Sequence, residues 1–302
     1  MSVQPNSAPS TARSQWLADA AVLLVAVFWG SSFITAQKVI LIYPLFLFLF
    51  FRFTLSMLLL LPAVWGKLKS FTPETLKTGA IFGLFLSLIF SLETLGIAYT
   101  TATNAGFLIS LCIVFVPVIE ALLSRRLPNM LVLGAVLLSF VGTGMLTLKT
   151  GYSFNIGDLF ILSAAVVRAL FMIFSKKLTD GKKTDNALLT FVQLGIVALC
   201  TGIVSFLKYP PTQMKLPSPE VWASLLYLAV FCTIYAFYVQ LTFIRRSSPA
   251  RVGLLLGTEP LFAALFGITL GQETVTAVGW VGGICILVAT WMGRRAEEAS
   301  RA

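Results

Sequence analysis

Ten apolar runs, each close to the length needed to cross a bilayer, occupy almost the whole chain of 302 residues. A membrane-spanning helix needs about 20 mainly apolar residues, and charged residues, prolines and glycines separate runs of that length here. The runs lie at 18–37, 43–64, 76–98, 102–123, 130–148, 157–175, 187–207, 221–244, 250–270 and 275–292. The sequence therefore predicts an all-α integral membrane protein with ten transmembrane helices and no separate soluble domain.

The composition excludes several classes of function. Charged residues make up 11% of the chain, against about 25% in soluble domains, which excludes an ordinary soluble enzyme. The sequence contains no histidine, so haem and histidine–zinc chemistry are excluded. Its four cysteines lack the C-x-x-C spacing of a redox or zinc site. We expect no cofactor, no metal and no nucleic-acid partner, although the net charge is +10.

The basic residues between the runs predict the orientation in the membrane. Sixteen Lys and Arg fall on the side of the N-terminus and four on the other side, with two more inside the runs. Lys and Arg concentrate in cytoplasmic loops. We therefore expect a multi-pass protein of the cell inner (cytoplasmic) membrane with both termini in the cytoplasm.

The two halves of the chain resemble each other when they are laid in register. Equivalent positions are Asp19 and Asp158, Trp29 and Arg168, Glu93 and Gln240, and Pro117 and Pro260. Because five spans is an odd number, the second half enters the membrane from the opposite side, which makes the halves inverted repeats. The predicted domains are a polar cytoplasmic N-terminus (1–16), two five-helix repeats (17–149 and 150–293) around a central cavity, and a cytoplasmic tail (294–302). This arrangement suits transport by alternating access.

Four ionisable residues stand out inside the predicted spans: Arg52, Glu93, Arg168 and Glu259. Each costs about 2.5–3.5 kcal/mol near a helix centre, so such residues are kept where protein or water solvates them. Arg168 is expected to bind a substrate carboxylate, with Glu259 as its partner or as a ligand for an ammonium group. A purely structural ion pair is the alternative. Glu93 is a candidate proton or ammonium site, and Arg52 is expected to serve helix packing.

Further candidate contacts for a substrate are aromatic or small polar residues: Trp29, Ser32, Tyr235 and Tyr238. The polar groups of the three aromatic residues need partners if they are buried, and a hydrated cavity would supply them. Ser32 lies just after a patch of small residues where a helix or a ligand can approach closely. Pro117 and Pro260 remove a backbone donor in mid-helix and are predicted to bend their spans, as hinges or as packing kinks.

Several motifs resemble those of the drug/metabolite transporter superfamily: Phe28-Trp29-Gly30-Ser31-Ser32-Phe33, Arg52 in the second span, and the two proline-containing helices. Within the superfamily the chain is most similar to EamA-type exporters, especially amino-acid exporters of the YddG type. The resemblance implies a basket of ten helices that exports neutral or aromatic amino acids, such as threonine, methionine or phenylalanine, and related metabolites. Proton coupling and the choice between monomer and dimer stay open. The chain departs from the family pattern at Arg168, where a second tryptophan is usual.

Two alternative functions stay open at this stage. One is an integral-membrane enzyme that handles a lipid or an isoprenoid, although the interfacial loops are short and carry neither histidine nor paired acids. The other is a lipid flippase or a passive channel. Saturable counterflow of a labelled amino acid would indicate a carrier.

Overall fold

The computed structural model describes residues 12–100, 102–125, 130–147, 155–210, 212, 214–271 and 276–301. The first half consists of α1 (Ala12–Ile40), α2 (Leu45–Val64), the short 3-10 helix η1 (Trp65–Ser70), α3 (Pro73–Ile97), α4 (Ala102–Ser110), α5 (Cys112–Ser124) and α6 (Met130–Thr147). The second half consists of α7 (Ile156–Thr179), α8 (Asn186–Lys208), α9 (Pro219–Ala229), the π-helical turn η3 (Val230–Tyr235), α10 (Ala236–Arg246), α11 (Pro249–Leu256), α12 (Glu259–Gly271) and α13 (Ala277–Arg301).

Side-chain caps fix where several helices begin. Thr72, Asp185, Ser218 and Ser248 each accept a hydrogen bond from a backbone N–H in the first turn of the next helix. Asn155 does the same for α7 and forms a reciprocal capping box with Asp158. Such caps satisfy backbone donors that a helix leaves unpaired at its start, so the apolar spans end at polar residues.

The described helices account for all ten predicted spans. Eight are long and apolar enough to cross a membrane, and two shorter apolar helices, Met130–Met145 and Ala277–Gly293, match the fifth and tenth predicted runs. Three spans are interrupted helices: α4 and α5 share one, α9, η3 and α10 share another, and α11 and α12 share a third. The prediction of an all-α membrane protein is confirmed.

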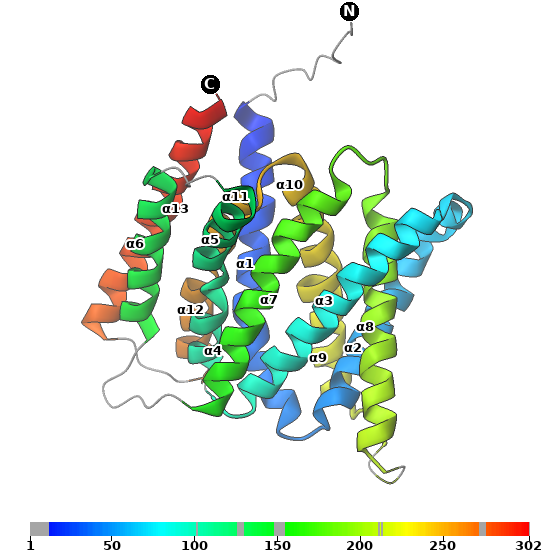
Figure 1. The fold of residues 1–302 in the computed structure, drawn as a ribbon. Coiled ribbons are helices and arrows are strands. Elements are labelled where there is room, and N and C mark those ends of the chain that lie inside the picture. The colour runs from blue at the N-terminus through cyan, green and yellow to red at the C-terminus, as the bar shows by residue number, and fades with distance from the viewer. Residues whose placement is uncertain are drawn as a thin grey trace, which may run out of the picture.

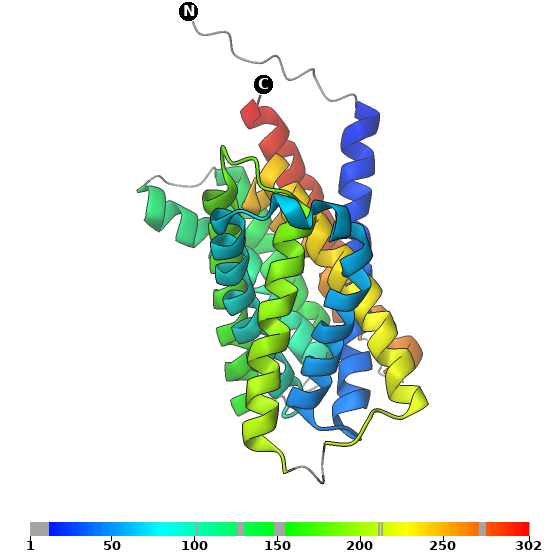
Figure 2. The ribbon, with the colours of Figure 1, turned by 90° about the vertical axis from the view of Figure 1, so that its right-hand side faces the viewer.

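The two halves have opposite orientations and are interwoven. Helix α1 begins at the end of the bundle where α13 finishes, whereas α7 begins at the opposite end (Figure 1). Helix α1 packs on α12 of the second half, and α7 packs on α5 of the first half. The equivalent helices α2 and α8 lie side by side (Figure 2), as do α6 and α13. These contacts are those expected of two inverted repeats related by a pseudo-two-fold axis.

Glycines allow two of these helix pairs to pack closely. A Cβ atom at Gly30 of α1 would lie 2.6 Å from Cβ of Phe262 in α12. A Cβ atom at Gly142 of α6 would lie 2.6 Å from the carbonyl oxygen of Gly282 in α13. Backbones in membranes approach this closely where small residues line the interface.

Parts of the predicted domain limits lie outside the described residues. These are the boundary between the repeats at residues 149–150 and most of the predicted N-terminal segment. At the other end of the chain, α13 continues as a helix to Arg301, so residues 294–301 prolong the last helix beyond its apolar part, which ends at Gly293.

Candidate substrate-binding site

A central cavity lies between the two repeats. Its walls come from α1, α2, α3, α7, α10 and α12 and consist of Trp29, Ser32, Arg52, Leu86, Ile89, Phe90, Glu93, Arg168, Phe171, Phe237, Gln240 and Glu259. The free space between these side chains is about 20 Å³, which is room for about one water molecule. The lining side chains therefore fill most of the cavity in this conformation.

Positions equivalent in the two repeats meet in this cavity. The equivalent pairs that line it are Trp29 and Arg168, Ser32 and Phe171, Phe90 and Phe237, and Glu93 and Gln240. The rings of Phe90 and Phe237 also contact each other, with centroids 5.8 Å apart. The pseudo-two-fold axis of the repeats therefore passes through the cavity, which is where inverted-repeat transporters place their substrate.

Arg168 is the centre of the polar contacts in the cavity. Its Nη2 donates to Oε2 of Glu259 at 2.9 Å, and its guanidinium lies 4.3 Å from the ring centroid of Trp29. Both members of the ion pair are buried. The indole N–H of Trp29 donates to the carbonyl of Cys232 at 2.9 Å, in the π-helical turn η3. Arg168 of α7 is thus held by Glu259 of α12 and by Trp29 of α1.

The break between α11 and α12 positions Glu259. Residues 257 and 258 form a turn, and Glu259 is the first residue of α12. A carboxylate is favourable there because the N-terminus of a helix carries partial positive charge. Pro260 comes next, at a position where its missing N–H is not needed, so this proline begins a new helix inside the span.

Arg52 also lines the cavity, although the sequence suggested a packing role for it. Its Nε donates to Oγ1 of Thr233 at 3.0 Å, and its guanidinium lies 4.8 Å from the ring centroid of Phe90. It forms no ion pair with a carboxylate in the part of the chain that the structure describes. The cavity therefore contains a second buried cation, for which the sequence predicts helix packing rather than a place in the site.

Two polar groups in the cavity have spare bonding capacity. Among the described residues, the carboxylate of Glu93 makes no hydrogen bond or ion pair, and Nε2 of Gln240 is buried without a partner. Gln240 and Arg52 are the polar lining residues that the predicted site did not include. Glu93 and Gln240 are equivalent in the repeats, so the repeat was the signal that could have added Gln240.

The other predicted residues lie elsewhere. The hydroxyl of Tyr235 donates to the carbonyl of Ala21 at 3.2 Å, away from the cavity lining, and Tyr238 lines a separate polar pocket. Pro117 lies inside α5, but the break in its span is at Leu111. The structure thus brings together Trp29, Ser32, Glu93, Arg168 and Glu259, and places the two tyrosines outside the cavity.

Two buried aspartates, equivalent in the repeats, bond to other spans at opposite ends of the bundle. Near the start of α1, Asp19 accepts from Nη2 of Arg251 at 3.0 and 3.1 Å. Near the start of α7, Asp158 accepts from the hydroxyl of Thr100 at 2.7 Å. We call these contacts the Asp19 and Asp158 end contacts. Each contact joins a residue of one repeat to a residue of the other.

Comparison with known proteins identifies the family. The EamA-like transporter family matches residues 16–148 and 155–293. An uncharacterized transporter of Archaeoglobus fulgidus is 32% identical over 276 residues, covering 90% of this chain and 84% of that protein. Transporter YetK of Bacillus subtilis, also named as uncharacterized, is 25% identical and covers 85% of this chain and 81% of its own length.

A solved crystal structure shares the fold. It superimposes with a TM-score of 0.76 at 17% identity and covers 95% of this chain and 99% of its own. The family consists of transporters, so the alternative of a lipid- or isoprenoid-handling enzyme is wrong. Its two matches agree with the two repeats seen in the structure. The chain is a multi-pass membrane transporter and belongs to the EamA-like transporter family.

Proposed function

We propose that this transporter exports amino acids, neutral or aromatic, and related small metabolites across the cytoplasmic membrane by alternating access. The central cavity would be the substrate site. It holds two cations, Arg52 and Arg168, and two carboxylates, Glu93 and Glu259, between aromatic walls. A zwitterion with an apolar side chain is complementary to such a set, because its carboxylate and ammonium need opposite charges and its side chain needs an apolar surface.

The observation that carries this proposal is the ion pair between Arg168 and Glu259. It occupies the cavity that the substrate would fill, and only about 20 Å³ is left free. A bound amino acid would replace both partners: its carboxylate would bind Arg168, and its ammonium would bind Glu259 or Glu93. When the ammonium binds Glu259, the exchange leaves Arg168 and Glu259 each next to an opposite charge, which matters because an uncompensated charge in the membrane is costly.

The two end contacts support alternating access. A carrier must open one end while the other stays closed, and a contact made by an equivalent aspartate at each end can fulfil this requirement. Opening towards the termini would break the contact between Asp19 and Arg251. Opening towards the other side would break the contact between Thr100 and Asp158. The excess of basic residues on the side of the termini supports a cytoplasmic location for that side.

Counterflow in proteoliposomes tests the proposal. Vesicles preloaded with unlabelled phenylalanine, methionine or threonine should accumulate a labelled amino acid in a saturable manner, and nucleobases or sugars should compete poorly. An imposed pH gradient in the same vesicles would show proton coupling, for which Glu93 is the candidate group. Linear flux would point to a channel, and movement of labelled lipid without amino-acid counterflow would point to a flippase. Either result would overturn the proposal.

A further inference from the structure

A second polar pocket lies at the end of the bundle where α1 begins and α13 finishes. It has a volume of about 440 Å³ and lies between the last turns of α10, the start of α8 and the loop before α8. It shares no lining residue with the central cavity. The proposed function makes no use of it.

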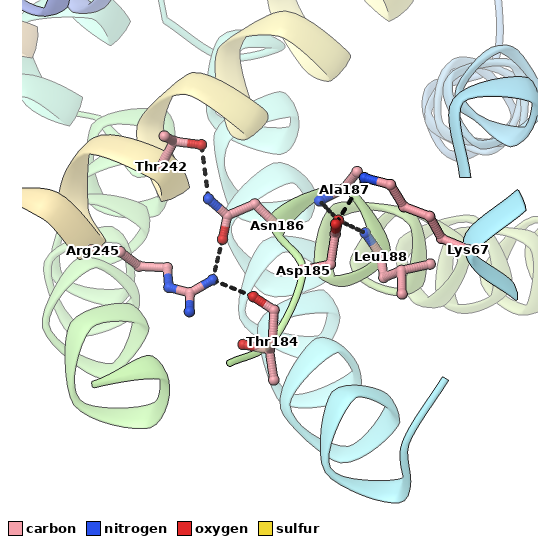
Figure 3. Close-up of polar contacts among 8 residues, drawn as sticks. All are labelled: Lys67, Thr184, Asp185, Asn186, Ala187, Leu188, Thr242 and Arg245. Carbon is pink, nitrogen blue, oxygen red and sulfur yellow. Dashed lines mark hydrogen bonds and ion pairs between the residues drawn. The ribbon is translucent and has the colours of Figure 1, made fainter. Parts of the chain in front are cut away.

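Arg245 forms one wall of this pocket and is held by neutral acceptors. Its Nη1 donates to the carbonyl of Thr184 at 2.7 Å and to the side chain of Asn186, and its Nη2 donates to the carbonyl of Lys182 at 2.7 Å (Figure 3 shows the first two). Neutral acceptors fix the guanidinium without cancelling its charge. The Nδ2 of Asn186 in turn donates to Oγ1 of Thr242 at 2.9 Å, so the Thr242 hydroxyl keeps its own proton to donate.

Both carboxylate oxygens of Asp185, the acid in the lining, already accept hydrogen bonds. The carboxylate accepts from Nζ of Lys67 at 2.8 Å and from the backbone N–H groups of Ala187 and Leu188 at 2.7 and 3.2 Å (Figure 3). Partial burial acts to raise the pKa of Asp185, but the hydrogen bonds from Lys67 and the two N–H groups outweigh it and lower the pKa. Lys67 and Asp185 together carry no net charge, so the pocket as a whole stays positive.

Arg246 supplies the charge that is free to bind a ligand. Its side chain is exposed and lines the pocket, and it has no bonded partner among the described residues. Tyr238 lines the same space, and Oγ1 of Thr184 is buried without a partner in the described part of the chain. The pocket thus offers two guanidinium groups and several hydroxyl donors, and it contains no free carboxylate.

We propose that this pocket binds a phosphate-bearing anion, with Arg246 as the direct cation, Arg245 as a fixed second positive charge, and Thr242 and Tyr238 as hydroxyl donors. Guanidinium groups match the oxygens of phosphate. Basic pockets between transmembrane helices at the cytoplasmic face are known to accommodate acidic lipid headgroups. A lipid headgroup and a soluble phosphate ester share this chemistry, and the test separates them.

Binding to the purified full-length protein in neutral detergent tests the proposal. Native mass spectrometry would compare dioctanoyl phosphatidylglycerol with dioctanoyl phosphatidylcholine, and calorimetry would measure glycerol phosphate. We expect the wild type to prefer the acidic lipid by about tenfold or more and Arg246→Gln to lose about tenfold, or about 1.4 kcal/mol. Arg246→Lys should lose less affinity than Arg246→Gln because lysine keeps the positive charge. It should still bind more weakly than the wild type because lysine lacks the planar fork of donors. Unchanged melting temperatures would show that each variant is folded.

Lys177→Gln is the matched control, since Lys177 is an exposed basic residue in the last turn of α7, a helix that finishes at the same end of the bundle, and it does not line the pocket. It should bind like the wild type. Glycerol phosphate that binds as well as the lipid, with the same dependence on Arg246, would support the pocket with a soluble ligand. Equal losses in Arg246→Gln and Lys177→Gln would mean diffuse surface attraction and overturn the proposal, as would the absence of any preference for an acidic ligand. None of these readouts depends on transport, so this proposal and the proposed function can fail separately.

Discussion

The guanidinium of Arg168 stacks on the indole of Trp29 at 4.3 Å, and the two residues occupy equivalent positions in the two repeats. One repeat therefore supplies the cation of the cavity, and the other supplies the ring on which it rests. A guanidinium over a tryptophan gains about 2 kcal/mol when it is desolvated, which fixes its position next to Glu259. The departure from two-fold symmetry at this position creates the ion pair at the centre of the site.

A double variant separates a substrate site from a structural ion pair. Arg168→Gln or Glu259→Gln alone leaves one buried charge without its partner and should destabilise the protein by about 3–5 kcal/mol. Arg168→Gln/Glu259→Gln should recover most of that stability. We expect all three variants to lose saturable counterflow, while Glu74→Gln, at an exposed acid that pairs with Lys182, keeps it. Recovery of counterflow in the double variant would show that the pair is structural only.

The end contacts predict opposite effects of two similar substitutions. Asp19→Asn weakens the contact with Arg251 and should favour opening towards the termini, whereas Asp158→Asn should favour opening at the other end. Hydrogen–deuterium exchange measures this directly. Exchange should rise near the start of α11 in the first variant and at the turn between α3 and α4 in the second. Faster exchange at the same end in both variants would contradict the assignment of one contact to each end.

Close packing of α1 on α12 predicts a steric effect at Gly30. Gly30→Ala places a methyl group 2.6 Å from Cβ of Phe262 and 2.7 Å from the backbone N of Ala263. Because backbone cannot move aside as a side chain can, we expect a loss of about 1–3 kcal/mol, read as a lower melting temperature. Gly134→Ala is the control, since nothing lies within 4 Å of its added Cβ. A melting temperature for Gly30→Ala equal to that of the wild type would contradict the prediction, because it would show that α1 and α12 can move apart to accommodate the methyl group.

The lowered pKa of Asp185 predicts a pH-dependent contribution to stability. A carboxyl group whose pKa is lower in the folded state stabilises the protein above its ordinary pKa of about 3.9 and loses this effect as the pH falls through the folded-state value. Asp185→Asn should therefore melt below the wild type at pH 7, and the gap should close in acid. Asp185→Ala also removes the cap of α8 and should lose about 0.5–2 kcal/mol at either pH. A gap for Asp185→Asn that does not change with pH would contradict the role of the charge.

The distribution of Lys and Arg predicts the location of the termini. A reporter that is active only in the cytoplasm should be active when fused to either end of the chain, because both ends belong to the basic side. Fusions after residue 149 should be inactive, since five spans precede that point. Activity of the fusion at residue 149 together with inactivity at the termini would reverse the orientation.

The sequence was sufficient for the spans and for the polar residues at mid-span. Trp29, Glu93, Arg168 and Glu259 could be identified because polar and charged groups are expensive in the membrane, and the repeat identified Trp29 and Arg168 as equivalents. Arg52 was assigned to packing because a sequence gives the depth of a residue along its span but not its direction. Nearly every other residue of α2 is apolar, so the sequence does not distinguish the face of α2 that lines the cavity from the face that packs on other helices.

The place of Tyr238 could not be predicted for a different reason. The turn η3 (Val230–Tyr235) has the wider π-helical geometry, which inserts a residue relative to a regular helix and rotates the rest of the span by about 100°. Phe237 and Gln240 consequently face the cavity, while Tyr238 faces the second pocket. A periodicity of 3.6 residues carried through this span cannot show such a rotation.

The interweaving of the two halves has a consequence for biosynthesis. Helix α1 leaves the ribosome well before α11 and α12, yet Gly30 and Asp19 find their partners on α12 and α11. The contacts of α1 with α11 and α12 can therefore form only after more than 200 further residues have been inserted. The same interdependence means that two fragments divided at the middle loop should complement each other when they are coexpressed, and that neither should accumulate alone.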